Sequence, residues 1–110
     1  MNEIAGASMS PRHSLADVDR ILHEPARLVI ATMLYAVDAA DFLYLLRESG
    51  LSKGNLSSHL SRLEAAGYVS IEKTFRGKIP LTICRFTGSG REAFRAYRDH
   101  LKRIVDTLPE

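Results

Sequence analysis

Short polar side chains gather between positions 52 and 62, and their spacing matches one side of a helix. At about 100° per residue, Asn55, Ser58 and Arg62 recur at i, i+3 and i+7 and point the same way. The opposite side carries three leucines, at i, i+4 and i+7: Leu56, Leu60 and Leu63. Asparagine pairs bidentately with adenine and arginine with guanine, and serine hydroxyls donate to phosphates or base edges. The pattern therefore indicates hydrogen bonding to a nucleic acid.

The serine content of this polar side distinguishes it from a helix face that only keeps a protein in solution. Glutamate and lysine are better helix formers than serine or asparagine, so a purely solvated face would be richer in them. Short side chains lower the helix propensity but let the backbone approach another surface closely. We interpret the segment as a reading helix for nucleic acid, and a polar face without a ligand is the alternative.

A basic turn lies downstream, where Lys73, Arg76 and Lys78 surround Gly77. Three cations on one tight turn repel each other, and the phosphates of a nucleic acid would offset that repulsion. The alternative is that these charges only prevent edge-to-edge pairing with another sheet. Directly after a reading helix, the turn favours contact with nucleic acid.

The distribution of charge agrees with this interpretation. The net charge of the 110 residues is only +2, but positions 51–91 carry seven basic residues against two acidic ones. A local basic surface attracts polyanions even when the whole chain is nearly neutral. Charge alone does not separate this case from a solvated face without a partner.

The elements that hold these side chains can be predicted from caps and periodicity. Residues 1–12 lack periodicity and predict a mobile tail, and residues 13–110 predict a single domain. Ser14 can cap a first helix, which carries the apolar residues Leu15, Val18, Ile21 and Leu22. Pro25 suits the first turn of a second, mostly apolar helix over about 25–37.

A helix-turn-helix is expected next. Residues 38–41 form a short break, and Asp41 can cap a third helix that ends at Gly50. Ser52 can cap the fourth helix, the reading helix, over about 53–66.

A β-hairpin and a last helix complete the chain. Alternating, β-rich residues predict strands over 68–75 and 81–86, joined by the basic turn around Gly77. The order of elements defines a mainly helical α+β fold, a winged helix-turn-helix with a two-stranded wing and a long C-terminal helix.

The last helix is predicted to start after Thr87 and to span about 89–108, with Gly88 and Gly90 leaving its first turn loose. Its apolar residues are spaced 3, 4, 3, 4, as in a coiled-coil seam: Phe94, Tyr97, Leu101, Ile104 and Leu108. Because the helix is long for so small a domain, we expect the seam to form a homodimer. The expected partner surface is the first helix, through Leu15, Val18 and Leu22. Packing of the seam on its own domain is the alternative.

Three stretches resemble winged-helix regulators of the MarR/ArsR type, most of all their compact single-domain relatives. They are His23–Leu28, Leu51–Leu60 and Leu63–Val69, which contain the pattern Ser-x-x-x-Leu-Ser-x-His-Leu-x-x-Leu-Glu-x-x-Gly-Tyr-Val. The stretch Phe86–Arg91 resembles the Leu-Thr-Pro-x-Gly-Arg start of the family's last helix, with Gly88 in place of the usual proline.

The resemblance implies a two-fold dimer that regulates transcription. Its fourth helices would lie in successive major grooves of double-stranded DNA, and its operator would be a pseudo-palindrome. The implied readers are Ser52, Lys53, Asn55, Ser57, Ser58, His59, Ser61 and Arg62. The wings would lie along the flanking backbone or minor groove, with contacts from Lys73, Arg76, Gly77 and Lys78.

A metal-sensing repressor of the ArsR kind is one alternative. The expected third helix has no Cys or His, and His100 in the last helix is poorly spaced from Asp99 and Asp106 for one site. The single cysteine, Cys84, is expected to be a buried apolar thiol in a strand. No metal and no other cofactor is therefore expected.

The same residues also bear on two other classes of protein, enzymes and protein–protein interaction modules. An enzyme is not expected, because no Ser/His/Asp or Cys/His set, phosphate loop or paired carboxylates can be found. A winged helix used only for protein–protein contact would not need a basic tip. We expect a cytoplasmic protein, since there is no signal-peptide pattern, no membrane-length apolar run and no disulfide. Whether a small-molecule effector exists stays open.

Overall fold

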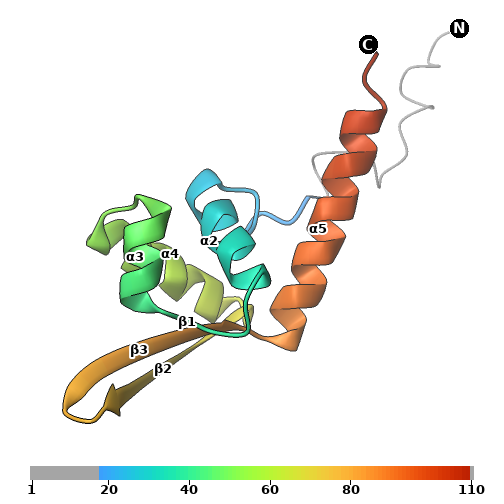
Figure 1. The fold of residues 1–110 in the computed structure, drawn as a ribbon. Helices are drawn as coiled ribbons and strands as arrows, with labels where there is room; N and C mark the ends of the chain where they lie inside the picture. Colours follow the sequence, from blue (N-terminus) through green and yellow to red (C-terminus); the bar gives the residue numbers. More distant parts are fainter. Residues whose placement is uncertain (1–17, 110) are drawn as a thin grey trace, which may run out of the picture.

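The computed structural model describes residues 18–109 as helices packed over a small sheet (Figure 1). The elements are helix α2 (Pro25–Tyr35), strand β1 (Ala40–Asp41), helix α3 (Phe42–Ser49), helix α4 (Lys53–Ala65), strands β2 (Val69–Arg76) and β3 (Ile79–Phe86), and helix α5 (Gly88–Asp106). The three strands are antiparallel in the order β1-β3-β2. The predicted α+β fold, with a helix-turn-helix, a hairpin wing and a long last helix, is confirmed.

The segment before α2 differs from the prediction. The tail over 1–12, Ser14 and Leu15 lie outside the described residues, but residues 18–24 form turns where the periodicity predicts helix. The Asp19 carboxylate stabilises these turns, because its Oδ1 accepts the backbone N–H groups of Ile21 (2.9 Å) and Leu22 (3.1 Å). An aspartate that satisfies two successive N–H groups offers the backbone an alternative to the helix.

The caps of the helix-turn-helix were correctly predicted. Asp41 Oδ1 accepts the backbone N–H of Tyr44 at 2.8 Å at the start of α3, and Gly50 closes that helix with φ 74°. Ser52 Oγ accepts the backbone N–H of Asn55 at 3.2 Å and caps α4. These side chains replace the helical partners that the first N–H groups lack.

Helix α4 ends in a Schellman motif. The N–H of Gly67 (φ 81°) donates to the Glu64 carbonyl at 2.9 Å, and the N–H of Tyr68 donates to the Leu63 carbonyl at 3.0 Å. Only glycine adopts this left-handed conformation without strain. The chain therefore turns sharply from α4 into β2.

Strand β1 was not predicted, because two residues are too short to show an alternating pattern. The sequence of residues 38–41 predicts only a break between helices. In the structure, Ala40 pairs with Cys84 and Asp41 with Ile83, so β1 covers one edge of β3 at the base of the hairpin. Beyond that base the hairpin has two strands.

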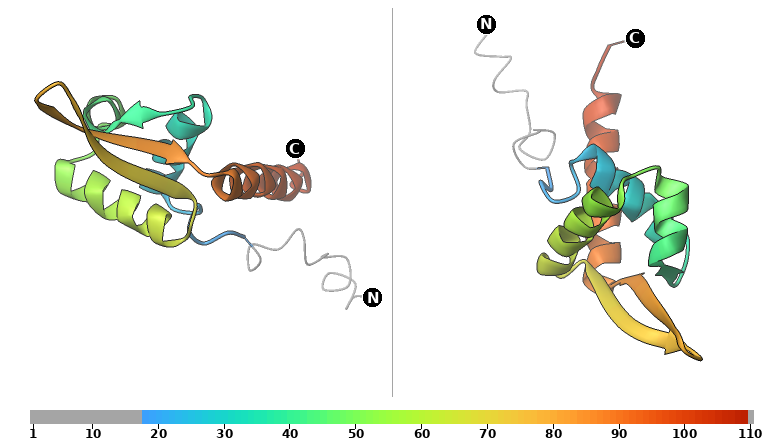
Figure 2. Two further views of the ribbon diagram at one scale, coloured as in Figure 1. Left: turned by 90° about the horizontal axis from the view of Figure 1, so that it is seen from below. Right: turned by 90° about the vertical axis from the view of Figure 1, so that its left-hand side faces the viewer.

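The hairpin formed by β2 and β3, which we call the wing, runs in register from Val69↔Phe86 to Arg76↔Ile79. Its turn consists of Gly77 and Lys78, and Gly77 has φ 63°, as the first central residue of a tight hairpin turn requires. Strand β3 begins at Ile79, earlier than the predicted residue 81. The tip of the wing extends past all the helices in each view (Figure 2).

The core centres on α2, which is the buried central helix that its composition predicts. Ile30, Ala31 and Leu34 of α2 are at most 1% exposed. They pack in one cluster with these residues from the other elements: Val18, Leu22, Leu45, Leu56, Leu60, Leu63, Val69, Cys84, Phe86, Phe94 and Tyr97. Cys84 is fully buried, as expected, and burial raises the pKa of its thiol to about 11.

The first turn of α5 is packed tightly, which corrects the prediction that Gly88 and Gly90 leave it loose. A Cβ on Gly90 would collide with the backbone carbonyl of Tyr68 and with the ring of Phe86. Thr87 caps the helix by accepting the Gly90 N–H at 2.9 Å. Gly90 is therefore needed where α5 meets the sheet, whereas a Cβ on Gly88 would meet open space.

Candidate nucleic-acid interface

Helix α4 presents two different sides, as its sequence pattern predicts. Leu56, Leu60 and Leu63 are at most 2% exposed and fix the helix to the core. The predicted readers that are exposed on its other sides are Ser52, Lys53, Asn55, Ser57, Ser58, Ser61 and Arg62, and Glu64 is exposed as well. Seven of the eight predicted readers are thus accessible to a partner, and five of them are hydroxyl or amide side chains.

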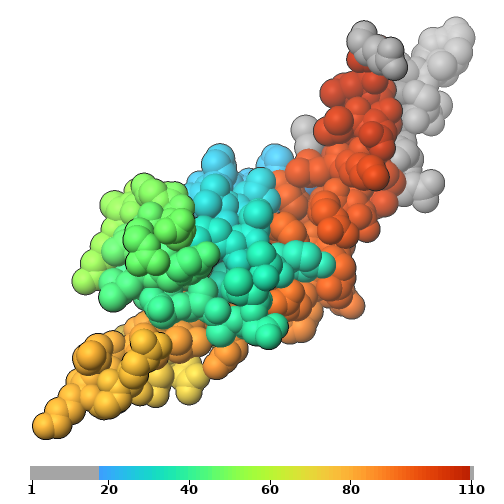
Figure 3. Space-filling view, viewed as in Figure 1, coloured from blue at the N-terminus to red at the C-terminus, as the bar shows by residue number. Residues whose placement is uncertain are grey.

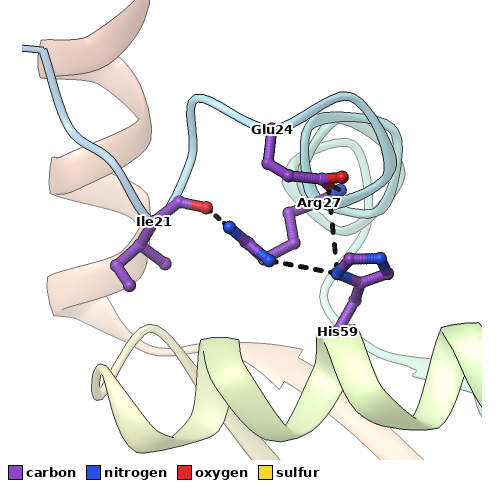
Figure 4. Close-up of polar contacts among 4 residues, drawn as sticks. All are labelled: Ile21, Glu24, Arg27 and His59. Atoms are coloured by element: carbon purple, nitrogen blue, oxygen red, sulfur yellow. Dashed lines mark hydrogen bonds and ion pairs between the residues drawn. The ribbon is translucent and has the colours of Figure 1, made fainter.

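His59 is the exception among the eight, because its side chain is only 20% exposed and turns toward α2 (Figure 4). Its Nδ1 lies 3.1 Å from Arg27 Nη1 and 3.9 Å from Glu24 Oε1. Arginine has only donors, so in this contact Nη1 donates and His59 Nδ1 accepts. His59 therefore holds α4 against the start of α2.

Arg27 is the centre of this contact and was missed as a functional residue in the sequence. It is only 8% exposed, and its Nε donates to the carbonyl of Ile21 at 2.6 Å. It thereby ties the 18–24 turns, α2 and α4 together. A charged residue within the mostly apolar α2 was the available signal, since a buried charge needs partners.

Glu24 completes the contact from the N-cap of α2. Its Oε1 accepts the backbone N–H of Arg27 at 2.8 Å. That hydrogen bond is the main cause that lowers the pKa of Glu24, and the charge of Arg27 also lowers it, against the opposing effect of desolvation. The orientation of the reading helix is therefore set by a polar cluster as well as by its leucines.

The wing places its predicted residues at and near its tip. Lys73, Arg76, Gly77 and Lys78 are all exposed. Lys73 lies opposite Thr82, and Arg76 lies opposite Ile79 next to the turn. The basic groups predicted to contact a nucleic-acid backbone are therefore exposed in the part of the chain that the structure describes.

An open groove of about 830 Å³ lies between helices α3 and α4 and the wing. Lys53, Ser57 and Ser61 line it from α4, and Lys73 and Thr82 line it from the wing. Its apolar floor includes Phe42, Leu46, Leu60 and Ile71, and Asp41 and Glu64 add two carboxylates. The groove brings the reading helix and the wing together, with a lysine on each wall.

The predicted dimer seam is divided by the fold. Val18, Leu22, Phe94 and Tyr97 are at most 8% exposed and belong to the core of their own chain. Leu101 and Ile104 are half-buried, and Leu108 is 65% exposed. Helix α5 projects away from the body at this end (Figure 3). The seam residues that are not part of the core are therefore Leu101 and Ile104 in the outer part of α5 and Leu108 just beyond its end. Val105, in the same part of α5, is 58% exposed.

The 18–24 turns connect this helix to the rest of the domain. Tyr97 on α5 forms a hydrogen bond of 2.9 Å with His23 Nδ1, and Tyr68 donates to Asp19 Oδ2 at 2.6 Å. The bond to Asp19 raises the pKa of Tyr68 to about 12, because it stabilises the neutral phenol. The turns therefore contact α5, the wing base and, through Arg27, the reading helix.

Two observations bear on the alternatives to a nucleic-acid site. Within residues 18–109, no group of three or more His, Cys, Asp or Glu side chains is arranged to hold a metal ion. Among the same residues, no helix combines the length and apolar content needed to cross a membrane.

Comparison with known proteins agrees with this geometry. Residues 26–105 match the family described as winged helix DNA-binding domain. The chain therefore belongs to this family of winged-helix proteins. An uncharacterised protein of Methanocaldococcus jannaschii is 35% identical over 79 residues, which cover 71% of this chain and 85% of that protein.

Two solved structures share the fold. A transcriptional regulator homologue from Pyrococcus horikoshii OT3 is 32% identical with a TM-score of 0.79, covering 84% of this chain and 91% of that one. A protein with a GntR superfamily winged-helix-turn-helix domain from Halomicrobium mukohataei is 21% identical with a TM-score of 0.62, covering 83% and 72%. The second likeness concerns the fold alone.

Proposed function

We propose that this protein is a sequence-specific regulator of transcription that binds double-stranded DNA and catalyses no reaction. The observation that carries the proposal is the exposed polar side of α4, fixed by three buried leucines, beside the basic wing across the groove. The solved relative from Pyrococcus horikoshii, described as a transcriptional regulator homologue, supports it.

In this proposal α4 enters the major groove of the duplex. Asn55, Ser58 and Arg62 face base edges, because they lie on the side opposite the buried leucines. Lys53 and Lys73, on the two walls of the groove, bind the phosphate backbone that passes between α4 and the wing. His59 contributes by holding the helix in place.

We further propose that two copies bind together, as in regulators of the MarR/ArsR type. The exposed apolar residues of the outer part of α5 supply the contact, and the two-fold symmetry sets a pseudo-palindromic operator. Half-sites of such dimers lie about 10 bp apart. A metal-responsive role has no support from the described residues.

The test begins with selection of bound sites from random duplex DNA. Arg62→Ala should then weaken binding to the selected site by about 1–3 kcal/mol and relax the preference at one base pair. Arg103→Ala is the matched control, since Arg103 is also exposed but lies in the outer part of α5. Wild-type protein that ignores every duplex at low salt would refute the proposal.

A further inference from the structure

The tip of the wing is apolar as well as basic. Phe75 and Ile79 are 67% and 66% exposed, and Pro80 beside them is exposed too. Burial of one such large side chain typically stabilises a protein by about 1.5–3 kcal/mol, so leaving two in water forgoes a large contribution. The tip also contains Arg76 and Lys78, and no acidic residue lies between positions 73 and 80.

The strand register places these apolar side chains on both faces of the hairpin. Phe75 lies opposite Pro80, and Ile79 lies opposite Arg76, so the two pairs point to opposite faces. Lys73, two residues before Phe75, shares its face and lines the groove toward α4. Phe75 therefore continues the row that faces the proposed path of the DNA.

Among residues 18–109, Arg76, Ile79 and Pro80 share an open hollow with Tyr44 and Arg47 of α3, but the tip stays largely uncovered, since Phe75 and Ile79 are 67% and 66% exposed. The space-filling view shows the hairpin projecting from the body at its lower left, clear of the helices (Figure 3). A tip that only prevented edge pairing would be polar, since charges and prolines suffice for that purpose. The combination of apolar side chains with flanking cations instead suits a narrow binding groove that has negative charge at its edges and apolar walls.

We propose that the wing tip is an apolar wedge that enters the minor groove of DNA and bends the duplex. This rests on the proposed function and adds to it, because the charges alone require only a contact along the backbone. Phe75 leads the insertion against the sugars and base steps, with Ile79 on the opposite wall. Minor-groove proteins insert phenylalanine, isoleucine and proline in this way and kink the duplex.

The cations beside the apolar side chains suit the negative charge of the minor groove. Arg76 and Lys78 neutralise phosphates on the two strands that border the minor groove. Kinking is easiest at pyrimidine–purine steps, so the wedge adds a sequence preference outside the bases that α4 reads. The operator should therefore carry flexible TA or CA steps where the wing lies.

The first experiment uses tryptophan as a reporter, because the chain contains none. Phe75→Trp places a single tryptophan at the tip, and Val29→Trp places one on α2, where Val29 is 43% exposed. On saturation with a selected duplex, fluorescence of Phe75→Trp should fall by roughly half through contact with the bases, while Val29→Trp should stay unchanged. Equal responses at both positions would overturn the wedge.

The second experiment measures the bend by energy transfer between dyes at the two ends of the same duplex. Wild-type protein should bend it by about 20–90°. Phe75→Ala should reduce the bend and lower the affinity roughly tenfold. Arg76→Ala should instead mainly flatten the salt dependence by about one unit. Phe75 and Arg76 are both exposed, so the variants should fold, and circular dichroism is the check.

The outcomes separate the wedge from the proposed function. If the wild-type protein binds DNA and leaves it straight, the wedge is refuted and the proposed function stands. If it binds no duplex, the proposed function itself fails. If the emission of Phe75→Trp shifts with protein concentration in the absence of DNA, the tip contacts a second copy, and the wedge is refuted.

Discussion

At the scale of single residues, Arg27 links the reading helix to the rest of the domain. Its guanidinium is almost fully buried and donates to the carbonyl of Ile21 and to His59 (Figure 4). Leaving a buried charge without its hydrogen-bonding partners destabilises the fold, and so does leaving those partners without the charged group. Changes at this one position should therefore affect both stability and the placement of α4.

Arg27→Met should lower the free energy of unfolding by about 1–3 kcal/mol. The variant keeps most of the side-chain volume but leaves the Ile21 carbonyl and His59 Nδ1 without their donor. Urea denaturation measures the difference. Arg47→Met is the control, because the Arg47 side chain is 66% exposed and its loss should change stability by less than about 0.5 kcal/mol. Equal stability of the two variants would show that the buried contact has no energetic role.

Glu24 gives the cluster a dependence on pH. Its pKa in the folded protein is lowered, chiefly by the Arg27 N–H, so the folded state favours the carboxylate. The stabilisation is present above the ordinary pKa of 4.5 and is lost as the pH falls through the lowered value. Glu24→Gln should therefore destabilise the protein at pH 7 and have less effect at pH 3, as followed by urea denaturation at both values. A loss of stability that is the same at both would contradict this assignment.

His59 shows where residue-level prediction from the sequence ends. A helical wheel separates Leu56 from Asn55, but a residue on the boundary can face either solvent or a neighbouring element. Which one applies depends on where the N-terminus of α2 lies, and this is set by the turns at 18–24 that the periodicity misses. The orientation of the leucines and of the outward serines could be predicted, because these residues lie at the centre of the buried and the exposed side of the helix.

At the scale of elements, capping residues made the helix-turn-helix predictable. Asp41, Ser52 and Gly50 act locally, so their sequence signal matches their structural role. Strand β1 and the close packing of Gly90 depend on residues far away in the sequence, which no local pattern contains. The groove between α4 and the wing likewise cannot be predicted until the register of the sheet is known.

Gly90 provides a test of the junction between α5 and the sheet. Gly90→Ala should destabilise the domain by about 1–3 kcal/mol, because its Cβ meets the Tyr68 carbonyl and the Phe86 ring and the helix must shift. Gly88→Ala is the matched control two residues earlier in the same helix, where a Cβ meets nothing. Thermal denaturation compares them. A Gly90→Ala protein that melts no lower than Gly88→Ala would show that the junction adapts freely.

At the scale of the whole molecule, α5 has two parts with different surroundings. Its first part packs Phe94 and Tyr97 into the core, while Val105 in its last turn and Leu108 just beyond its end are exposed. The division could not be predicted from the regular heptad spacing, because this spacing does not show whether a residue contacts its own chain or a second copy. The described core therefore forms within one chain, and Val105 and Leu108 are exposed outside it.

The last prediction concerns the assembly. Ile104→Glu with Leu108→Glu should convert a dimer into folded monomers, because a charge in an apolar contact loses its water while the core residues of α5 are untouched. Light scattering measures the mass, and circular dichroism confirms the fold. The control Ala96→Glu adds a charge to an exposed position outside the seam and should leave the dimer intact. Monomers should still bind a half-site but lose much of their affinity for the full operator, because joining two sites raises the effective concentration. A double variant that remains dimeric would place the contact elsewhere on the molecule.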